Sequence, residues 1–296
     1  MLFRKVAIIG VGLLGGSLGL AARQQRLAER VHGYVRRQSS LAECRAAGAV
    51  DDVSTDLTTV VTDADLVVLC TPIGQMGALL ATARSALGRG AIVTDVGSVK
   101  APVVAEAEPL CAKAGARFIG SHPMAGSEKT GVGAAQARLF DGAVCAVTPT
   151  SQSDPAALVQ IEAFWRALGM QVIRLTPANH DAFVAHASHL PQAIAASLAG
   201  LVLDPSFPSE QARLCAGGFR DGTRIASGSP EMWRDIFVAN RRPAIQAMDA
   251  FVARLRILRK AIRAGDAEAI RNVLETAKQR RDAWAKARPA ATQPGA

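Results

Sequence analysis

The chain has 296 residues, of which 49% are hydrophobic and only 4% aromatic, and its formal net charge is +9. This length suits two domains that each bury a core, and the hydrophobic content excludes a disordered protein. The five cysteines include no CxxC pair, so we expect reduced thiols and neither a disulfide framework nor a metal site. Because no apolar run approaches the roughly 18 residues of a membrane span and the N-terminus lacks signal-peptide features, we expect a cytoplasmic protein.

The excess positive charge lies mainly in the last third of the chain, where it alternates with apolar residues at helical spacing. No aromatic platform for nucleic-acid bases accompanies it. A basic surface also attracts small polyanions such as a phosphorylated cofactor or a dicarboxylate. We therefore expect a small-molecule substrate, and neither a nucleic acid nor a membrane as partner.

The first half of the chain alternates strand-like and helical segments. Strands are expected at residues 5–10, 31–35, 65–70, 91–95, 117–121, 143–148 and 171–175, and helices at residues 13–25, 73–87, 99–113 and 156–168. This alternation predicts an α/β fold with a Rossmann-type, doubly wound parallel sheet and right-handed crossovers. We place this N-terminal domain at residues 1–177.

From residue 178 the strand pattern disappears. Helices are expected at residues 181–203, 210–215, 230–264 and 267–285. We predict an all-helical domain over residues 178–287 that serves as substrate wall and dimer interface. Residues 288–296 form a low-complexity tail, for which we expect disorder.

A glycine-rich loop, Gly10-Val11-Gly12-Leu13-Leu14-Gly15, joins the first expected strand to the first expected helix. In this context the first glycine permits a tight turn, the second lets the backbone approach a pyrophosphate, and the third lets helix and strand pack closely. The free N–H groups at the start of the helix would face the phosphates. The loop predicts a dinucleotide-binding domain, and hence an oxidoreductase.

The end of the second expected strand indicates which dinucleotide binds. Gly33-Tyr34 is followed by Val35-Arg36-Arg37-Gln38-Ser39, without the carboxylate that usually holds the ribose hydroxyls of NAD. The guanidinium groups of Arg36 and Arg37 and the hydroxyl of Ser39 would suit the 2′-phosphate of NADP. The alternative is that both arginines are merely exposed loop residues. We predict that NADP⁺ is preferred and that NAD⁺ is possible.

Two polar segments fall where expected strands end, which is where ligands bind in open α/β sheets. One is residues 94–100, with Ser98, and the other is residues 120–131, with His122. A histidine placed there can accept a proton from a hydroxyl that is losing hydride. Taken alone, such a histidine is more often structural.

Four separated motifs resemble the prephenate/arogenate dehydrogenase family over about residues 5–285. They are Gly97-Ser98-Val99-Lys100, His122-Pro123-Met124-Ala125-Gly126, Ser188-His189-Leu190-Pro191 and Gly218-Phe219-Arg220-Asp221-Gly222-Thr223-Arg224-Ile225-Ala226. The resemblance implies oxidative decarboxylation of a cyclohexadienol late in tyrosine biosynthesis, with hydride passing to the nicotinamide. It also implies a homodimer formed through the helical domain.

The same resemblance assigns roles to residues. His122 would polarise the ring hydroxyl, and Ser98 would bond both that histidine and the hydroxyl region. Arg224 would clamp a substrate carboxylate, unless it is only a surface arginine. The remaining expected contacts are His189 and Gln192 lining the pocket, with a structural role open for His189, Glu128 at the pocket mouth, and Thr71 and Pro72 against the cofactor.

Two departures bear on the substrate. Many prephenate-specific members carry a second histidine directly after the His-Leu-Pro string, where this chain has Gln192. The loop with Arg36 and Ser39 also resembles that of NADP-linked arogenate dehydrogenases. We therefore predict an NADP-dependent arogenate dehydrogenase, the alternative being a prephenate dehydrogenase or a dual-specificity cyclohexadienyl dehydrogenase.

Two other classes compete with this interpretation. A β-hydroxyacid dehydrogenase or an imine reductase would place a catalytic lysine or aspartate on a long helix, where this chain has a proline-broken, histidine-centred stretch. A regulatory NADP sensor or a basic nucleic-acid binder would need no hydride-transfer base such as His122.

Overall fold

The structure is a computed structural model that describes residues 1–127 and 129–287. Two expectations, Glu128 at the pocket mouth and a disordered tail at 288–296, lie outside the described residues. The chain divides into two compact units, Met1–Arg241 and a second unit that begins at Arg242. Among the described helices, none is both long enough and apolar enough to span a membrane.

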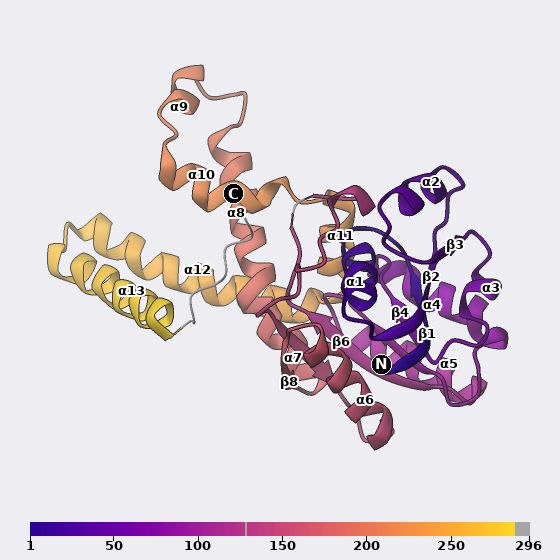
Figure 1. Cartoon of the computed structure of the whole chain (residues 1–296). Coiled ribbons are helices and arrows are strands. Elements are labelled where there is room, and N and C mark those ends of the chain that lie inside the picture. The colour runs from indigo at the N-terminus through magenta and orange to yellow at the C-terminus, as the bar shows by residue number, and fades with distance from the viewer. Residues whose placement is uncertain (128, 288–296) are drawn as a thin grey trace. The chain divides into compact units, whose positions relative to one another are not determined.

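The first unit is built on one eight-stranded sheet with the order β3-β2-β1-β4-β5-β6-β7-β8 (Figure 1). Its strands are β1 (Phe3–Ile9), β2 (Ala28–Tyr34), β3 (Asp52–Ser54), β4 (Leu66–Leu69), β5 (Ile92–Asp95), β6 (Arg117–Pro123), β7 (Val144–Thr148) and β8 (Gln171–Arg174). The expected doubly wound sheet is confirmed. A fully parallel sheet is wrong at one place, because β7 runs antiparallel to β6.

The antiparallel pair follows from the connection that precedes it. Parallel neighbours need a long crossover, usually a helix. In the described part of the connection from β6 to β7, the regular structure is one turn of 3-10 helix, Val132–Ala134. The chain therefore returns beside β6 in the opposite direction, and β8 then pairs with β7 in parallel after a full helical crossover.

Two hydrophobic cores lie on the two faces of this sheet. Along β1, Val6 and Ile8 enter one core and Ala7 and Ile9 enter the other, as alternation along a strand requires. The first core is covered by α1 (Leu13–Gln24) and α6 (Pro155–Ala167), and the second by α3 (Leu57–Val61), α4 (Ile73–Ala83) and α5 (Ala101–Ala114). Because the sheet is packed on both faces, the positions of its strand ends are fixed, and the loops of the site begin at those ends.

A helical segment completes the first unit. α7 (Pro177–Val184) and α8 (Leu190–Val202) are joined by one π-helical turn, Ala185–His189, so the expected helix at 181–203 is continuous but locally widened. The π turn lies beside Pro191, which cannot donate a helical hydrogen bond. The remaining helices of this segment are α9 (Ser209–Arg213), α10 (Gly217–Thr223) and α11 (Pro230–Ala239).

The second unit is a pair of helices, α12 (Arg241–Ala264) and α13 (Ala267–Ala287). The expected helix at 230–264 is wrong as a single element, because α11 ends at Ala239, Asn240 caps it, and α12 begins at Arg241. Gly265 ends α12 in a left-handed conformation with φ +65°, a common way to close a helix.

Candidate active site

The loops after β1 and β4 meet where the strand order reverses, which is the ligand-binding crevice of an open α/β sheet. Gly10 has a φ of +102°, a conformation that favours glycine. A Cβ on Gly15 would lie 2.1 Å from the carbonyl oxygen of Gly10, so α1 could not approach β1 as it does. A Cβ on Gly12 would meet no atom within 4 Å. Gly10 thus provides the turn, Gly15 permits the close packing of helix and strand, and Gly12 leaves open space above the loop.

A cavity of about 360 Å³ opens over this loop. Of the residues expected to bind the cofactor, it is lined by Gly10, Gly12, Arg36, Arg37, Thr71 and Pro72. Leu13, Leu14, Gly15 and Ser39 are not among its lining residues, and Ser40 lines it in place of Ser39. Further lining residues that the sequence did not indicate include Glu43, Gln75, Gly131 and Val132.

The cavity fits a dinucleotide by its polar groups as well as by its position. α1 begins after Gly12 without a side-chain cap, so its first N–H groups are available to phosphates. The hydroxyl of Thr71 is buried and has no hydrogen-bond partner among the described residues. A buried polar atom of this kind usually has a ligand or water partner in the working protein. The loop of Gly10 and Gly12, the arginines after β2 and Thr71 would hold the dinucleotide.

A buried ion pair fixes the neighbouring edge of the sheet, at the ends of β5 and β6. The ammonium of Lys100 contacts the carboxylate of Asp95 and donates to the backbone oxygen of Ser121 at 2.7 Å. Asp95 also accepts from the backbone N–H groups of Ser121 at 3.0 Å and Gly97 at 2.9 Å. Burial lowers the pKa of Lys100. These bonds hold the loop of Ser98 against the end of β6, where His122 lies.

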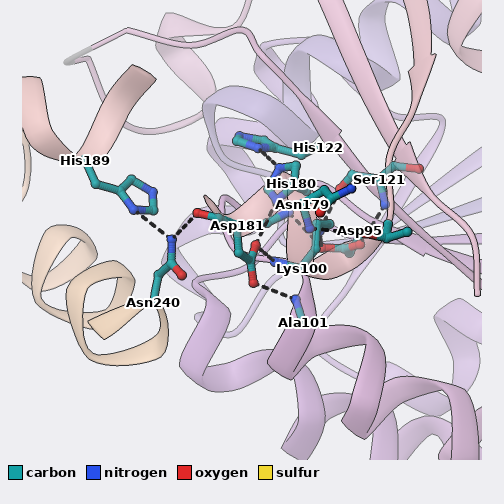
Figure 2. Close-up of polar contacts among 12 residues, drawn as sticks. Asp95, Lys100, Ala101, Ser121, His122, Asn179, His180, Asp181, His189 and Asn240 are labelled. Atoms are coloured by element: carbon teal, nitrogen blue, oxygen red, sulfur yellow. Dashed lines mark hydrogen bonds and ion pairs between the residues drawn. The ribbon is translucent and has the colours of Figure 1, made fainter. Parts of the chain in front are cut away.

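His122 is the first member of a chain of hydrogen bonds that continues through His180 to Asp181 (Figure 2). Its Nδ1 is 2.8 Å from Nε2 of His180, and Nδ1 of His180 is 2.8 Å from Oδ1 of Asp181. Asp181 also accepts from the backbone N–H groups of Lys100 at 2.7 Å and Ala101 at 2.8 Å, at the start of α5. Burial, with smaller contributions from His180, Lys100 and His189, lowers the pKa of His122 well below 6.5. His122 is therefore neutral near pH 7 and able to accept a proton.

The hydrogen bond that the resemblance implied between Ser98 and His122 is not formed among the described residues. Ser98 is half-buried in the loop between β5 and α5. The Nδ1 of His122 is occupied by His180 instead, because α7 brings that histidine against the end of β6. In the described part of the chain no group is bonded to Nε2 of His122, and this nitrogen is the one left to meet a substrate.

His189 lies in the π turn and belongs to the same network. Its Nδ1 is 3.1 Å from the amide nitrogen of Asn240, which also donates to the backbone oxygen of Asp181 at 2.8 Å (Figure 2). Since that amide nitrogen is a donor, Nδ1 of His189 accepts and its proton lies on Nε2. Burial lowers the pKa of His189 to about 4. Trp233 and Phe237 of α11 pack edge-on against the ring, at 6.1 and 6.3 Å between centroids.

Gln192 follows His189 by three residues in α8 and is buried with it. Its carbonyl oxygen, Oε1, has no hydrogen-bond partner among the described residues. Arg224 is exposed in a one-turn 3-10 helix, Arg224–Ser227, that contacts α8. The structure therefore brings His122 and His189 into one buried network, buries Gln192 one turn along α8 from His189, and leaves Arg224 exposed.

Two family models together match almost the whole described chain. The model of the prephenate dehydrogenase nucleotide-binding domain matches residues 18–174, and that of the prephenate dehydrogenase dimerization domain matches residues 176–276. The chain belongs to the prephenate dehydrogenase family. It is accordingly an NAD(P)-dependent oxidoreductase of tyrosine biosynthesis, and the resemblance drawn from the four motifs is confirmed.

Curated members of this family align with most of the chain. Prephenate dehydrogenase of Bacillus subtilis is 33% identical over 280 residues, which cover 94% of this chain and 75% of the relative. Cyclohexadienyl dehydrogenase of Zymomonas mobilis is 34% identical over 268 residues, which cover 90% of this chain and 91% of the relative.

Solved structures of the family superpose closely on the chain. Prephenate dehydrogenase from Aquifex aeolicus, in complex with hydroxyphenyl propionate and NAD⁺, has a TM-score of 0.87 at 31% identity and covers 94% of this chain and 98% of its own. Synechocystis arogenate dehydrogenase has a TM-score of 0.80 at 31% identity and covers 95% and 99%. Prephenate, arogenate and cyclohexadienyl dehydrogenases are thus all similar to this chain, so similarity leaves its substrate undecided.

Four residues of this network, Lys100, His180, Asp181 and Asn240, were given no role by the sequence. The sequence offers one weak signal for His180, namely that the chain has only five histidines, three of which the structure brings together: His122, His180 and His189. His122 and His180 are 58 residues apart in the sequence, so their contact becomes visible only in the folded chain.

Proposed function

We propose that the protein oxidatively decarboxylates arogenate to tyrosine and uses NADP⁺. The bound nicotinamide supplies the hydride acceptor. Hydride leaves the ring carbon that bears the hydroxyl while the hydroxyl proton passes to Nε2 of His122. The ring carboxylate leaves as CO₂, its electron pair completes the aromatic ring, and the proton returns from His122 to the phenolate oxygen of tyrosine. The observation that carries the choice of arogenate is the buried, unpartnered carbonyl oxygen of Gln192.

A buried acceptor without a partner favours a ligand that brings a donor. The side chain of arogenate carries an ammonium group, which can donate to Oε1 of Gln192. The side chain of prephenate carries a keto group at that position, which has no hydrogen to donate. His189 supports the same pose, because its proton on Nε2 suits the side-chain carboxylate that both substrates share.

The preference for NADP⁺ rests on the residues that line the dinucleotide cavity after β2. Arg36, Arg37 and Ser40 offer two cations and a hydroxyl for a 2′-phosphate. The acid among the lining residues, Glu43, lies on α2 (Ser39–Ala46) and not at the end of β2, where a ribose-binding carboxylate would stand. NAD⁺, which the Aquifex aeolicus enzyme binds, is the alternative cofactor.

The other site residues have roles that suit this reaction. His122 is neutral and buried at the end of β6, so it can take the ring hydroxyl proton as hydride departs. The hydroxyl of Ser98 would bond the same ring hydroxyl from the neighbouring loop. Arg224 would bind a substrate carboxylate through its fork of donors.

A two-by-two assay tests substrate and cofactor together. Reduction of NADP⁺ and NAD⁺ is measured with arogenate and with prephenate, and kcat/KM is compared. We expect the highest value for arogenate with NADP⁺. A higher value for prephenate would reject the role of Gln192, and a higher value for NAD⁺ would reject that of Arg36 and Arg37.

A substitution at Gln192 tests the choice of substrate separately from the choice of cofactor. Gln192→His replaces the acceptor by a residue that can donate to a keto group. We expect it to raise kcat/KM for prephenate relative to arogenate by about tenfold, the scale of one polar contact, without changing the preference between the two nucleotides. A ratio that does not move would show that Gln192 does not contact the substrate side chain.

We further propose that the protein is a homodimer, since its second family model is a dimerization domain. α12 and α13 together leave large apolar side chains exposed in the single chain, among them Val252, Leu255, Ile262, Leu274 and Trp284. Large apolar side chains gathered on exposed helices are typical of an interface. The cytoplasmic location expected from the sequence and the domain boundary between residues 177 and 178 stay predictions.

A further inference from the structure

His122, His180 and Asp181 form a linear chain whose direction is set at its far end (Figure 2). The carboxylate of Asp181 accepts from the backbone N–H groups of Lys100 and Ala101, which can only donate. An ionised carboxylate is an acceptor at both oxygens. The nitrogen of His180 that faces it, Nδ1, must therefore donate.

This direction passes along the chain to the base. A neutral histidine that carries its proton on Nδ1 has a lone pair on Nε2, so Nε2 of His180 accepts. Its partner at 2.8 Å, Nδ1 of His122, must then donate. We propose that His180 and Asp181 are positioning residues that hold the proton of His122 on Nδ1 and leave the lone pair of Nε2 for the substrate. This inference rests on the proposed role of His122 as the base.

The fixed tautomer matters because an imidazole side chain without such a partner favours the proton on Nε2. In that form His122 would present a donor to the ring hydroxyl and could not accept its proton. A wrong tautomer is known to cost a histidine base most of its activity. Once His122 has accepted the proton, its positive charge faces the carboxylate of Asp181 through the ring of His180.

The charged and titratable groups around His122 come from several elements. Lys100 and His189 lie near enough to lower the pKa of His122, and Asp95 is paired with Lys100. Of the two carboxylates named here, Asp181 is the one that hydrogen bonds connect to the ring of His122, through His180. The inference therefore stands on the geometry of that path and on the donors that fix Asp181.

A second observation gives the opposite tautomer to His189. The amide nitrogen of Asn240 donates both to the backbone oxygen of Asp181 and to Nδ1 of His189. The proton of His189 thus lies on Nε2. Hydrogen bonds thus connect Asp181 to His122 through His180 and to His189 through Asn240. Nε2 is an acceptor in His122 and a donor in His189.

Nitrogen NMR of the resting enzyme measures these tautomers directly. The protein has five histidines, so labelling histidine with ¹⁵N gives a small set of signals that single substitutions can assign. We expect His122 to be protonated on Nδ1 and not on Nε2, and His189 to show the reverse. A proton of His122 on Nε2, or a doubly protonated His180, would overturn the inference.

Two variants test the cause. In His180→Leu we expect the proton of His122 to move mainly to Nε2 and kcat to fall roughly 10²-fold, the scale of lost general-base catalysis, at unchanged dinucleotide affinity. In His180→Gln the amide nitrogen can donate to Asp181 while the amide oxygen accepts from Nδ1 of His122, so we expect the wild-type tautomer and a kcat well above that of His180→Leu. A tautomer and a kcat that stay as in the wild type in folded His180→Leu contradict the proposal, and where that variant does not fold the tautomer of the wild type decides it.

The matched control is His186→Leu, in the same helical segment. His186 is exposed, and its Nδ1 bonds to the backbone oxygen of Ala182. We expect it to leave the tautomer of His122 and kcat unchanged. The proposed base is tested separately by His122→Asn: normal turnover in that variant rejects His122 as base, whereas the tautomer in the resting wild type stands or falls without any turnover.

Discussion

At the scale of single residues, the site depends on histidines that the fold keeps neutral. His122 and His189 are both buried, and burial is the largest cause of the lowered pKa of each. A neutral imidazole can accept or donate according to its tautomer, whereas an imidazolium can only donate. The site thus holds an acceptor and a donor of the same residue type.

The base is tested by His122→Asn. The amide cannot take the ring hydroxyl proton, so we expect kcat to fall roughly 10²-fold or more, while the dissociation constant of the dinucleotide stays close to that of the wild type. Steady-state kinetics and a nucleotide-binding titration measure the two quantities. A variant with near-normal kcat would remove His122 from the mechanism.

The low pKa of His189 also predicts how stability depends on pH. The pKa is about 4 in the folded state and 6.5 in the unfolded chain, so between these values the unfolded chain binds a proton that the folded protein does not. Stability is therefore lost as the pH falls from 6.5 to 4, by about 3 kcal/mol from this residue. His122 acts in the same direction.

Urea unfolding at pH 7 and pH 5, at one protein concentration, measures this effect. The free energy of unfolding should be lower at pH 5, and the difference should shrink in His189→Gln, which retains a polar amide near Asn240. An equal difference in the wild type and the variant would mean that the pKa of His189 is the same in the folded and the unfolded state.

The sequence indicated His122 and His189 because each lies in a motif, and Gln192 because it directly follows the His-Leu-Pro string. It did not indicate His180 or Asp181, whose roles come from contacts with partners far along the chain. Asp181 bonds the backbone of Lys100 across 81 residues. Neither local pattern nor propensity carries that information, since the contact exists only once α7 packs against α5.

At the scale of elements, two glycines in the turn from β1 into α1 have different roles, one in dinucleotide binding and the other in packing. Gly12→Ala adds a Cβ into open space, where the pyrophosphate would approach. We expect a Tm close to that of the wild type and a dinucleotide affinity lower by about tenfold or more, which corresponds to at least one lost contact. Thermal unfolding and a binding titration give both values.

Gly15→Ala is the matched comparison. Its Cβ would lie 2.1 Å from the carbonyl oxygen of Gly10, so α1 must move away from β1. We expect Tm and dinucleotide affinity to fall together. A Gly15→Ala protein with a normal Tm would show that the close approach of helix and strand is not required.

The elements that the sequence predicted are those with long, clear periodicity, such as α1 and α6. It missed α2, β3, α3 and α10, which are short, because few residues carry their pattern. It also predicted β7 as one more parallel strand, since a strand pattern does not encode direction. Direction is set by the connection before β7, where the described loop lacks a crossover helix.

At the scale of the whole molecule, the exposed apolar faces of α12 and α13 predict dimerization. Leu255→Glu places a charge in the middle of α12, where Leu255 is 51% exposed in the single chain. We expect sedimentation equilibrium to show a dimer for the wild type and a monomer for the variant. Arg256→Glu, one residue further along the helix, controls for the added acid and should stay dimeric. A monomeric wild type would reject the homodimer.

The bonds of Asp181 to the start of α5 have a consequence for building chimaeras of this family. The two family models meet at residues 174–176, which makes that point the obvious place to exchange halves. Such an exchange would pair the His122 of one parent with the His180, Asp181 and Asn240 of the other. The part that must be inherited together runs from β5 through Asn240. A recombinant that keeps this stretch intact preserves the protonation of its base, whichever parent provides the last two helices.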